Sequence, residues 1–271
     1  MLIQITNTCN ELCPHCMQRS SSKPQHMTLE LAQKAKDFAI ASDTFVVMIS
    51  GGEPTLHPHF REIVEMFADV IPQVGIASNG TFITNHAKTE EMRTLLHRPN
   101  VILQITSIPT LYRDYALIME HKEELLSLGR VAIEEGPIHL KALGRCTDSP
   151  TLSENAKQDP STMSCLSSCL IAAQLPYHQA MVQMQFAGKF CHPLVDWKGF
   201  LHWSESWLCP HFAHITEPLA DISQKAHDWR PCGCCADYDK YRNNQSENYC
   251  KARKILGVKE KESISHVTHP L

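Results

Sequence analysis

The sequence predicts an α/β fold in which a parallel sheet occupies residues 1–146. Short β-branched or apolar runs alternate there with longer amphipathic stretches, which is the pattern of successive strand–helix units. The 271 residues, 43% of them hydrophobic, are enough to bury a sizeable core, so a disordered or collagen-like chain is excluded. No run approaches the roughly 18 apolar residues of a membrane helix, so we expect no membrane contact.

Six apolar runs have the length and composition of strands. They are Leu2–Thr6, Phe45–Ser50, Val74–Ser78, Val101–Thr106, Val131–Glu134 and Ile138–Leu143. Apolar residues at helical spacing predict helices between them, at Thr28–Ala41, Phe60–Phe67, Glu90–Leu96 and Tyr112–Leu128. Thr28 is placed to cap the first of these helices, and Gly129 to end the last.

The net charge and the amino-terminal sequence indicate the protein's binding partners and its compartment. The formal net charge of −4 lacks the basic excess of proteins that bind nucleic-acid backbones. The first six residues read Met-Leu-Ile-Gln-Ile-Thr, without the charged and apolar segments of a signal peptide, so we expect a cytoplasmic protein. In a reducing compartment, 12 cysteines are more often metal ligands or reactive thiols than a disulfide framework.

The composition changes beyond Cys146. Thr147–Ser161 is polar and contains two prolines, which predicts a connector over residues 147–190. All four tryptophans and eight of the 12 cysteines lie from residue 165 onward. A small region this rich in cysteine is more easily stabilised by metal than by an apolar core. We therefore expect a metal-binding domain at residues 191–250, followed by a charged tail at 251–271.

Three cysteines follow the first predicted strand closely. They are Cys9, Cys13 and Cys16, with three and then two residues between them. Three thiolates on one loop can bind three irons of a cubane [4Fe–4S] cluster and leave the fourth iron open to a small molecule. The alternative is a zinc site completed by His15 or by a distant cysteine. The position at the carboxyl end of a strand, where βα folds place their ligands, favours a functional role.

A second motif, Ser50-Gly51-Gly52-Glu53-Pro54, follows the second strand. Together the two motifs resemble the radical S-adenosylmethionine (SAM) superfamily over about residues 1–145. This resemblance implies a partial (β/α)6 barrel, a [4Fe–4S] cluster whose open iron binds SAM, and an electron donor such as flavodoxin or ferredoxin. His15 stands where the family commonly has an aromatic carbocycle, and we expect its flat imidazole to lie against the adenine of SAM.

The same resemblance assigns a SAM pocket to the strand ends. Gly51 and Gly52 let the backbone pass close to a ligand, because they have no Cβ. Glu53 offers a carboxylate to the amino group and the positive sulfonium of SAM. Ser78 and Asn79 follow the third strand and could bond to ribose hydroxyls or to the SAM carboxylate, although Asn-Gly is also an ordinary turn dipeptide.

The fourth and sixth strands add further candidates for this pocket. Thr106 and Ser107 end the fourth strand, where many family members carry a Ser-x-Asp-Gly pattern. This chain continues with Ile108-Pro109, so the family's carboxylate is missing. Arg145 could clamp a carboxylate of SAM or of the substrate with a bidentate fork, or could cap the sheet as a solvated charge.

The cysteines near the carboxyl end suggest a second metal site. Two short strands are predicted about a turn at Lys198-Gly199, with Cys191 before them and Cys209 after them. This hairpin resembles the auxiliary-cluster domains called SPASM and twitch, and the shorter twitch kind fits better because the seven-cysteine SPASM pattern is not reproduced. The expected ligands of an auxiliary iron–sulfur cluster are Cys191, Cys209, Cys232 and Cys235, with Cys234 and Cys250 as substitutes. A zinc ion is the alternative occupant.

The resemblance implies that SAM is cleaved reductively to a 5′-deoxyadenosyl radical, which abstracts hydrogen from a substrate C–H bond. Auxiliary-cluster relatives most often act on peptide or protein side chains, so we expect such a substrate first. Because the chain begins directly at its first strand, we expect no amino-terminal domain that captures a leader peptide. The alternative substrate is therefore a nucleoside, alone or within DNA or RNA, or a small amino-acid metabolite. A metal-binding protein without catalysis is the second alternative.

Overall fold

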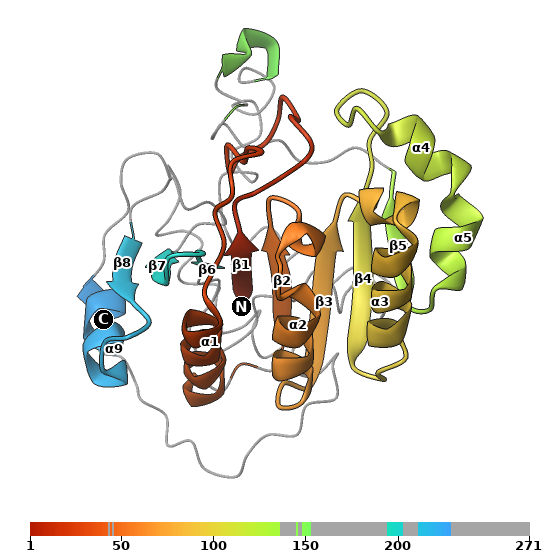
Figure 1. The fold of residues 1–271 in the computed structure, drawn as a ribbon. Helices are drawn as coiled ribbons and strands as arrows, with labels where there is room; N and C mark the ends of the chain where they lie inside the picture. Colours follow the sequence, from red (N-terminus) through yellow and green to blue (C-terminus); the bar gives the residue numbers. More distant parts are fainter. Residues whose placement is uncertain are drawn as a thin grey trace, which may run out of the picture.

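The computed structural model describes residues 1–42, 44, 46–135, 145, 148–152, 194–202 and 211–228. Their strands form one eight-stranded sheet in the order β5-β4-β3-β2-β1-β6-β7-β8 (Figure 1). The strands β1–β5 are parallel, so their carboxyl ends lie along one edge of the sheet. The predicted α/β class is confirmed, and this edge is where the predicted motifs gather.

The strands β1–β5 lie within one residue of the predicted bounds. They are β1 (Leu2–Thr6), β2 (Val46–Gly51), β3 (Gln73–Ser78), β4 (Val101–Thr106) and β5 (Val131–Glu134). The sixth predicted strand, Ile138–Leu143, lies outside the described residues.

On its other side, β1 pairs with a hairpin from the carboxyl-terminal half of the chain. β6 (Leu194–Val195) is parallel to β1, and β7 (Phe200–His202) and β8 (His211–His214) continue the sheet in antiparallel fashion. The predicted turn joins β6 to β7, and Gly199 adopts a φ of 90°, in the left-handed region that favours glycine. This hairpin therefore belongs to the same sheet as β1–β5.

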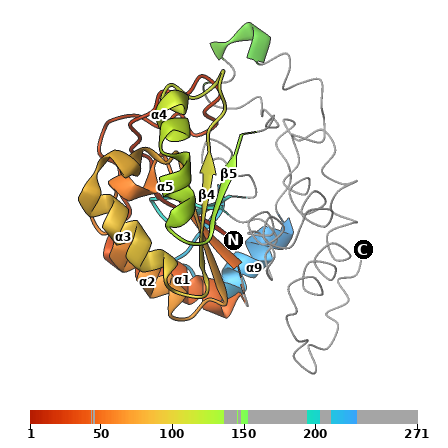
Figure 2. The ribbon, with the colours of Figure 1, turned by 90° about the vertical axis from the view of Figure 1, so that its right-hand side faces the viewer.

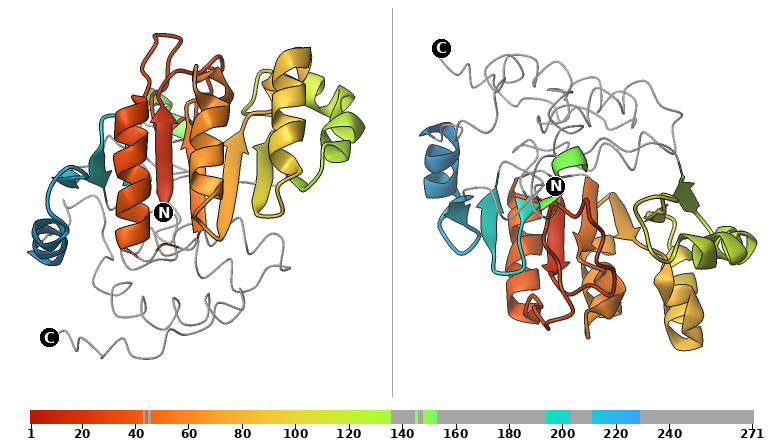
Figure 3. Two further views of the ribbon diagram at one scale, coloured as in Figure 1. Left: turned by 60° about the horizontal axis from the view of Figure 1, so that its bottom comes forward. Right: turned by 90° about the horizontal axis from the view of Figure 1, so that it is seen from above.

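The helices α1 (Leu29–Ala41), α2 (Phe60–Ala68) and α3 (His86–Leu96) cover one face of the sheet (Figures 2 and 3). Thr28 caps α1 as predicted, because its side chain accepts a hydrogen bond from the Leu31 N–H at 3.2 Å. α3 begins before the predicted residue 90, because the side chain of Asn85 accepts a hydrogen bond from the Lys88 N–H at 3.1 Å. A further helix, α9 (Leu219–Asp228), follows β8.

The single helix predicted at Tyr112–Leu128 is wrong, since the structure has two, α4 (Tyr115–Glu120) and α5 (Lys122–Ser127). His121 ends α4 and begins α5, and its Nδ1 lies 3.0 Å from the Glu124 carboxylate in the first turn of α5. Apolar spacing could not reveal the break, because buried side chains occur on both sides of it. Gly129 follows α5 with a φ of 143°, as its predicted role at the helix end requires.

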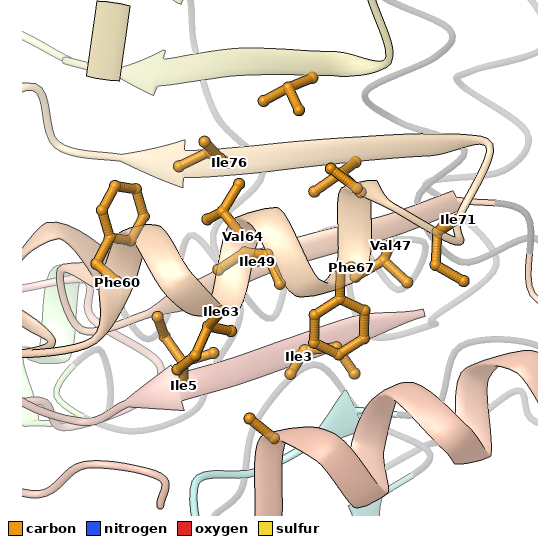
Figure 4. Close-up of a cluster of buried hydrophobic side chains, with 14 of the residues drawn as sticks. Ile3, Ile5, Val47, Ile49, Phe60, Ile63, Val64, Phe67, Ile71 and Ile76 are labelled. Carbon is orange, nitrogen blue, oxygen red and sulfur yellow. The ribbon is translucent and has the colours of Figure 1, made fainter. Parts of the chain in front are cut away.

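The apolar core lies between the helices and the sheet (Figure 4). α2 places its buried side chains at the spacing of one helix face. They are Phe60, Ile63, Val64 and Phe67, and they pack with Ile3, Ile5, Val47, Ile49 and Ile76 of β1–β3. Truncating one of the two phenylalanines to alanine would cost about 3–5 kcal/mol. This core fixes the three strands whose ends carry the site.

The opposite face of the sheet is more polar at its carboxyl edge. Side chains alternate along each strand, so Leu2 and Met48 pack with Leu194 on this face, away from the helix-covered core. By the same alternation it carries the polar residues Gln4, Gln104, Thr106 and Glu134. Among the described helices, none has the length and apolar composition needed to cross a bilayer.

Candidate functional site

The three cysteines lie on a loop that is ordered by its own backbone. The segment that leaves β1 pairs with the segment that returns to α1, through hydrogen bonds from the N–H groups of Asn7, Cys9 and Met27 to carbonyls across the loop, each at 2.8 Å. The Asn7 side chain adds a 3.0 Å bond from the Ser20 hydroxyl. The loop, which rises at the carboxyl end of β1 (Figure 1), is therefore held in shape by its own hydrogen bonds.

Burial raises the pKa of two of the three cysteines, Cys9 and Cys13. Cys9 and Cys13 are 8% and 9% exposed, and burial raises the pKa of each thiol to about 12. A thiolate is the form that binds iron, so the loop needs a positively charged metal group to deprotonate these residues at neutral pH. No three His, Cys, Asp or Glu side chains in the described part of the chain converge on a single ion position.

Gly51 and Gly52 attach the second motif to this loop. The N–H groups of Gly52 and Glu53 donate to the carbonyls of Thr6 and Thr8, both at 2.8 Å, so the pairing of β1 with β2 continues into the cysteine loop. A Cβ on Gly52 would lie 2.4 Å from the Thr8 carbonyl oxygen, and one on Gly51 would lie 2.4 Å from that of Thr6. The glycines are thus required for contact between two parts of the protein's own backbone.

The Glu53 carboxylate is fully buried and bonded to protein donors. It accepts hydrogen bonds from the Thr55 N–H (3.1 Å) and hydroxyl (2.6 Å), from the Ser78 hydroxyl, and from the Asn79 N–H (2.8 Å). Burial raises its pKa, while these hydrogen bonds lower it. Glu53 therefore joins the turn η1 (Pro54–Leu56) to the end of β3.

Asn79 is engaged in a second network. Its amide nitrogen donates to Asn10 Oδ1 at 2.9 Å, and its Oδ1 accepts from both the N–H and the hydroxyl of Thr81, at 3.0 and 2.7 Å. Asn10 in turn donates to the Thr81 hydroxyl at 2.8 Å. The side chains expected to contact SAM at the end of β3 thus connect the cysteine loop to β3 and to the turn η2 (Thr81–Thr84).

His15 lies against an aromatic ring of the protein. Its ring centroid is 5.1 Å from that of Tyr112, with an interplanar angle of 51°. Burial, with the nearby positive charge of Arg145, lowers the pKa of His15 to about 4, so the ring is neutral. Its buried Nδ1 has no hydrogen-bond partner among the described residues, which leaves one polar atom for a ligand.

The end of β4 contains a carboxylate that sequence reasoning missed. Thr106 pairs with Glu134 across the β4–β5 ladder, and its hydroxyl donates to Glu134 Oε2 at 3.3 Å. Gln104 donates to the same oxygen at 3.1 Å. Ser107 is fully buried, and its hydroxyl has no hydrogen-bond partner among the described residues. Glu134 was predicted only as the last residue of a strand, and its pairing with Thr106 is the signal that reveals it.

Glu11 is a second acidic residue that the motif analysis passed over. It lies between two of the cysteines, and only 2% of it is exposed. Its carboxylate accepts a hydrogen bond from the Asp114 N–H at 3.2 Å, which ties the cysteine loop to the start of α4. Burial raises the pKa of Glu11.

The predicted auxiliary ligands Cys191, Cys209, Cys232 and Cys235, and their substitutes Cys234 and Cys250, lie outside the described residues. The hairpin between the first two is described, and Asp196 organises it. Asp196 Oδ1 accepts from the N–H groups of Lys198 and Phe200 at 2.9 and 3.0 Å, and Oδ2 lies 3.2 Å from Nε2 of the buried His202.

Comparison with known proteins finds similarity over the part of the chain that carries this site. Residues 3–125 match the family model of the radical SAM superfamily. An 85-residue segment is 40% identical to GTP 3′,8-cyclase of Pasteurella multocida (strain Pm70) and covers 29% of this chain and 25% of that protein. A 112-residue segment is 25% identical to the antilisterial bacteriocin subtilosin biosynthesis protein AlbA of Bacillus subtilis (strain 168) and covers 41% of this chain and 25% of AlbA. The matches thus span about a quarter of the length of these curated relatives.

The fold comparison agrees with the family match. The structure of native anSMEcpe with bound AdoMet and Cp18Cys peptide superposes with a TM-score of 0.53 at 11% identity, and the match covers 95% of this chain and 97% of that one. Residues 3–125 therefore resemble the radical SAM superfamily in sequence, and the chain shares its α/β fold with that structure.

Proposed function

We propose that Cys9, Cys13 and Cys16 bind a [4Fe–4S] cluster at which the protein cleaves SAM reductively. One observation carries the proposal: the glycine motif is hydrogen-bonded directly onto the cysteine loop at the carboxyl edge of a parallel sheet. The two motifs that define the family's cofactor site are therefore parts of one structural unit.

The donor set fits a cluster better than a single zinc ion. Each cysteine of a cubane cluster binds its own iron, so the sulfur atoms need not converge on one point. A zinc ion needs four donors at tetrahedral positions, whereas the loop itself supplies three cysteines. The match of residues 3–125 to the radical SAM family model supports the cluster over the zinc alternative for the first site.

Held by Cys9, Cys13 and Cys16, a reduced [4Fe–4S] cluster would supply the electron for reductive cleavage of SAM, and the resulting 5′-deoxyadenosyl radical would abstract hydrogen from a substrate C–H bond. The electron comes from a donor such as flavodoxin or ferredoxin. The chain's own residues supply position: Glu53 and Asn79 fix the loops around the cluster site through their hydrogen bonds. Among the described residues, the buried Nδ1 of His15 and the hydroxyl of Ser107 lack a partner and would bind SAM or substrate.

We propose a peptide or protein side chain as the substrate. Similarity to AlbA, a bacteriocin biosynthesis protein, supports this choice, as does the fold shared with a peptide-bound structure. The competing similarity is to GTP 3′,8-cyclase and supports a nucleoside. We place peptides first, because an auxiliary cluster on Cys191, Cys209, Cys232 and Cys235 is the feature expected of peptide-modifying relatives.

The test of the central proposal is production of 5′-deoxyadenosine. Protein purified and reconstituted without oxygen should convert SAM to 5′-deoxyadenosine and methionine in the presence of dithionite. Changing Cys9, Cys13 and Cys16 to alanine should abolish this activity. Leu12, which is 66% exposed on the same loop, provides the matched control, and Leu12→Ala should retain it. Reductive cleavage by the triple variant would refute the proposal.

The triple variant also tests the auxiliary site and its metal. About four irons per chain remaining in it would support an auxiliary [4Fe–4S] cluster, whereas one zinc and no iron would support the structural alternative. Candidate peptides, nucleosides and DNA added to wild-type protein test the substrate. Stimulation by a nucleoside or polynucleotide, and by no peptide, would overturn the substrate proposal.

A further inference from the structure

Arg145 makes three hydrogen bonds to the cysteine loop. Its backbone N–H donates to the Cys16 carbonyl at 2.9 Å, its Nε donates to the Cys13 carbonyl at 2.9 Å, and its Nη1 donates to the Ser20 carbonyl at 2.6 Å. The remaining nitrogen, Nη2, is buried and has no hydrogen-bond partner among the described residues. The guanidinium therefore joins two points of the loop that are seven residues apart in sequence.

These bonds fall in the middle of the loop, away from its paired ends. Its two ends are paired by backbone hydrogen bonds between segments near Asn7 and Gln25. Between Cys13 and Ser20 the backbone makes two turn hydrogen bonds, from Cys16 N–H to the Cys13 carbonyl at 3.2 Å and from Arg19 N–H to the Cys16 carbonyl at 3.4 Å. This part carries two of the three proposed cluster ligands, and Arg145, like Arg19 through its ion pair with Asp148, ties it to a distant segment of the chain.

We propose that Arg145 is a positioning residue that closes the cysteine loop around the cluster site and places a positive charge beside it. The electrostatic half of this inference depends on the proposed function, since it concerns the bound cluster. The positioning half concerns the loop alone and is tested without metal.

The geometry disfavours the forked clamp on a ligand carboxylate that the sequence suggested. A bidentate fork uses two parallel N–H groups on one edge of the guanidinium. Nε and Nη1 belong to different edges, and each already donates to a carbonyl of the loop. Nη2 is left with capacity for a single anionic acceptor.

The positioning role is tested in metal-free protein by the rate at which iodoacetamide alkylates each cysteine, read residue by residue by mass spectrometry. In Arg145→Gln, Cys13 and Cys16 should react about tenfold faster, because the loop loses two hydrogen bonds from a charged donor. Loss of the charge alone would slow the reaction by lowering the thiolate fraction, so acceleration reports opening of the loop.

Arg19→Gln is the matched control. Arg19 lies on the same loop and forms a 2.6 Å ion pair with Asp148, but both side chains are largely exposed, so the variant should react within about twofold of wild type. Arg145→Lys keeps the charge without the planar fork and should give a rate between wild type and Arg145→Gln. If Arg145→Gln does not fold, the alkylation rate of Arg145→Lys tests the positioning role instead. A wild-type rate in either Arg145 variant would overturn the positioning role.

The electrostatic role is tested on reconstituted protein by a redox titration of the cluster followed by electron paramagnetic resonance. Removing a nearby cation disfavours the more negative, reduced cluster. Arg145→Gln should therefore lower the midpoint potential, and Arg145→Lys should keep it near that of wild type. An unchanged midpoint potential in Arg145→Gln would overturn the electrostatic role of Arg145. Wild-type protein that binds no cluster would contradict the proposed function instead, and the alkylation result would still stand.

Discussion

Replacing Gly52 with alanine would drive the glycine motif away from the cysteine loop. The new Cβ would lie 2.4 Å from the Thr8 carbonyl oxygen and 2.8 Å from Cys9 Cβ. An ordinary C···O contact is about 3.3 Å, so the two chains must separate by roughly 0.9 Å. That movement would stretch the 2.8 Å hydrogen bond from the Glu53 N–H to the Thr8 carbonyl beyond the usual limit of about 3.2 Å.

The cost follows from these contacts. Overpacking of a tight interior costs about 1–3 kcal/mol, and loss of a buried backbone hydrogen bond adds about 1–3 kcal/mol. We therefore expect Gly52→Ala to lower the free energy of unfolding of the metal-free protein by about 3–5 kcal/mol, a large part of the total for a typical domain. Urea unfolding followed by circular dichroism measures it. Because Cys9 is displaced, the reconstituted variant should also bind less iron.

Gly75→Ala is the control for this prediction. A Cβ on Gly75 would meet Met48 Cε at 2.7 Å and Sδ at 2.8 Å, which are atoms at the far end of a flexible side chain. Met48 can change rotamer, so the cost should stay below about 1.5 kcal/mol. Equal losses in the two variants, or a Gly52→Ala protein with full stability and full iron content, would refute the reasoning from backbone contact.

Three further predictions concern buried polar groups. Glu53→Gln places an amide N–H group against donors that bond to the carboxylate in the wild type. It should therefore lower the free energy of unfolding of the metal-free protein by about 1.5–3 kcal/mol in urea unfolding. No loss would mean that these hydrogen bonds do not stabilise the fold. Burial lowers the pKa of His57 from 6.5 to about 4, so its contribution to stability is full above pH 6.5 and is lost as the pH falls toward 4. Urea midpoints measured across that range should fall more steeply for wild type than for His57→Asn, and parallel curves would exclude this role. Asp196→Asn should lower the free energy of unfolding by about 1–3 kcal/mol, because it replaces the carboxylate that accepts from the buried His202 ring. An unchanged melting temperature in calorimetry would contradict this prediction.

The sequence was sufficient for the parallel strands and for the grouping of the motifs, because both depend on local patterns. Alternating apolar runs gave β1–β5 within one residue, and parallel strands bring their carboxyl ends together in any such sheet. The break at His121 was missed, because apolar spacing continues through it and only the ring's bond to Glu124 marks it.

The side-chain partners at the site could not be predicted, because they join residues far apart in the sequence. Glu53 bonds to Asn79, and Arg145 bonds to Cys13 across more than a hundred residues. A motif shows which residue types occur together, but not whether a polar atom faces a ligand or another part of the protein. Glu134 shows the converse case, since no motif marked a carboxylate that the β4–β5 pairing brings to the site.

A polar group that already has a hydrogen-bond partner in the protein differs in its role from one that has none. The side chains of Glu53, Ser78 and Asn79 already use their hydrogen-bonding groups within the protein, so they order the site before any ligand arrives. Buried polar atoms that lack a partner among the described residues include Nδ1 of His15 and the hydroxyl of Ser107. A buried polar atom without a partner destabilises the free protein, and a ligand that supplies the missing hydrogen bond recovers that free energy on binding. We therefore expect Glu53, Ser78 and Asn79 to preorganise the pocket, and His15 and Ser107, which the sequence also predicted for it, to supply hydrogen bonds to the ligand.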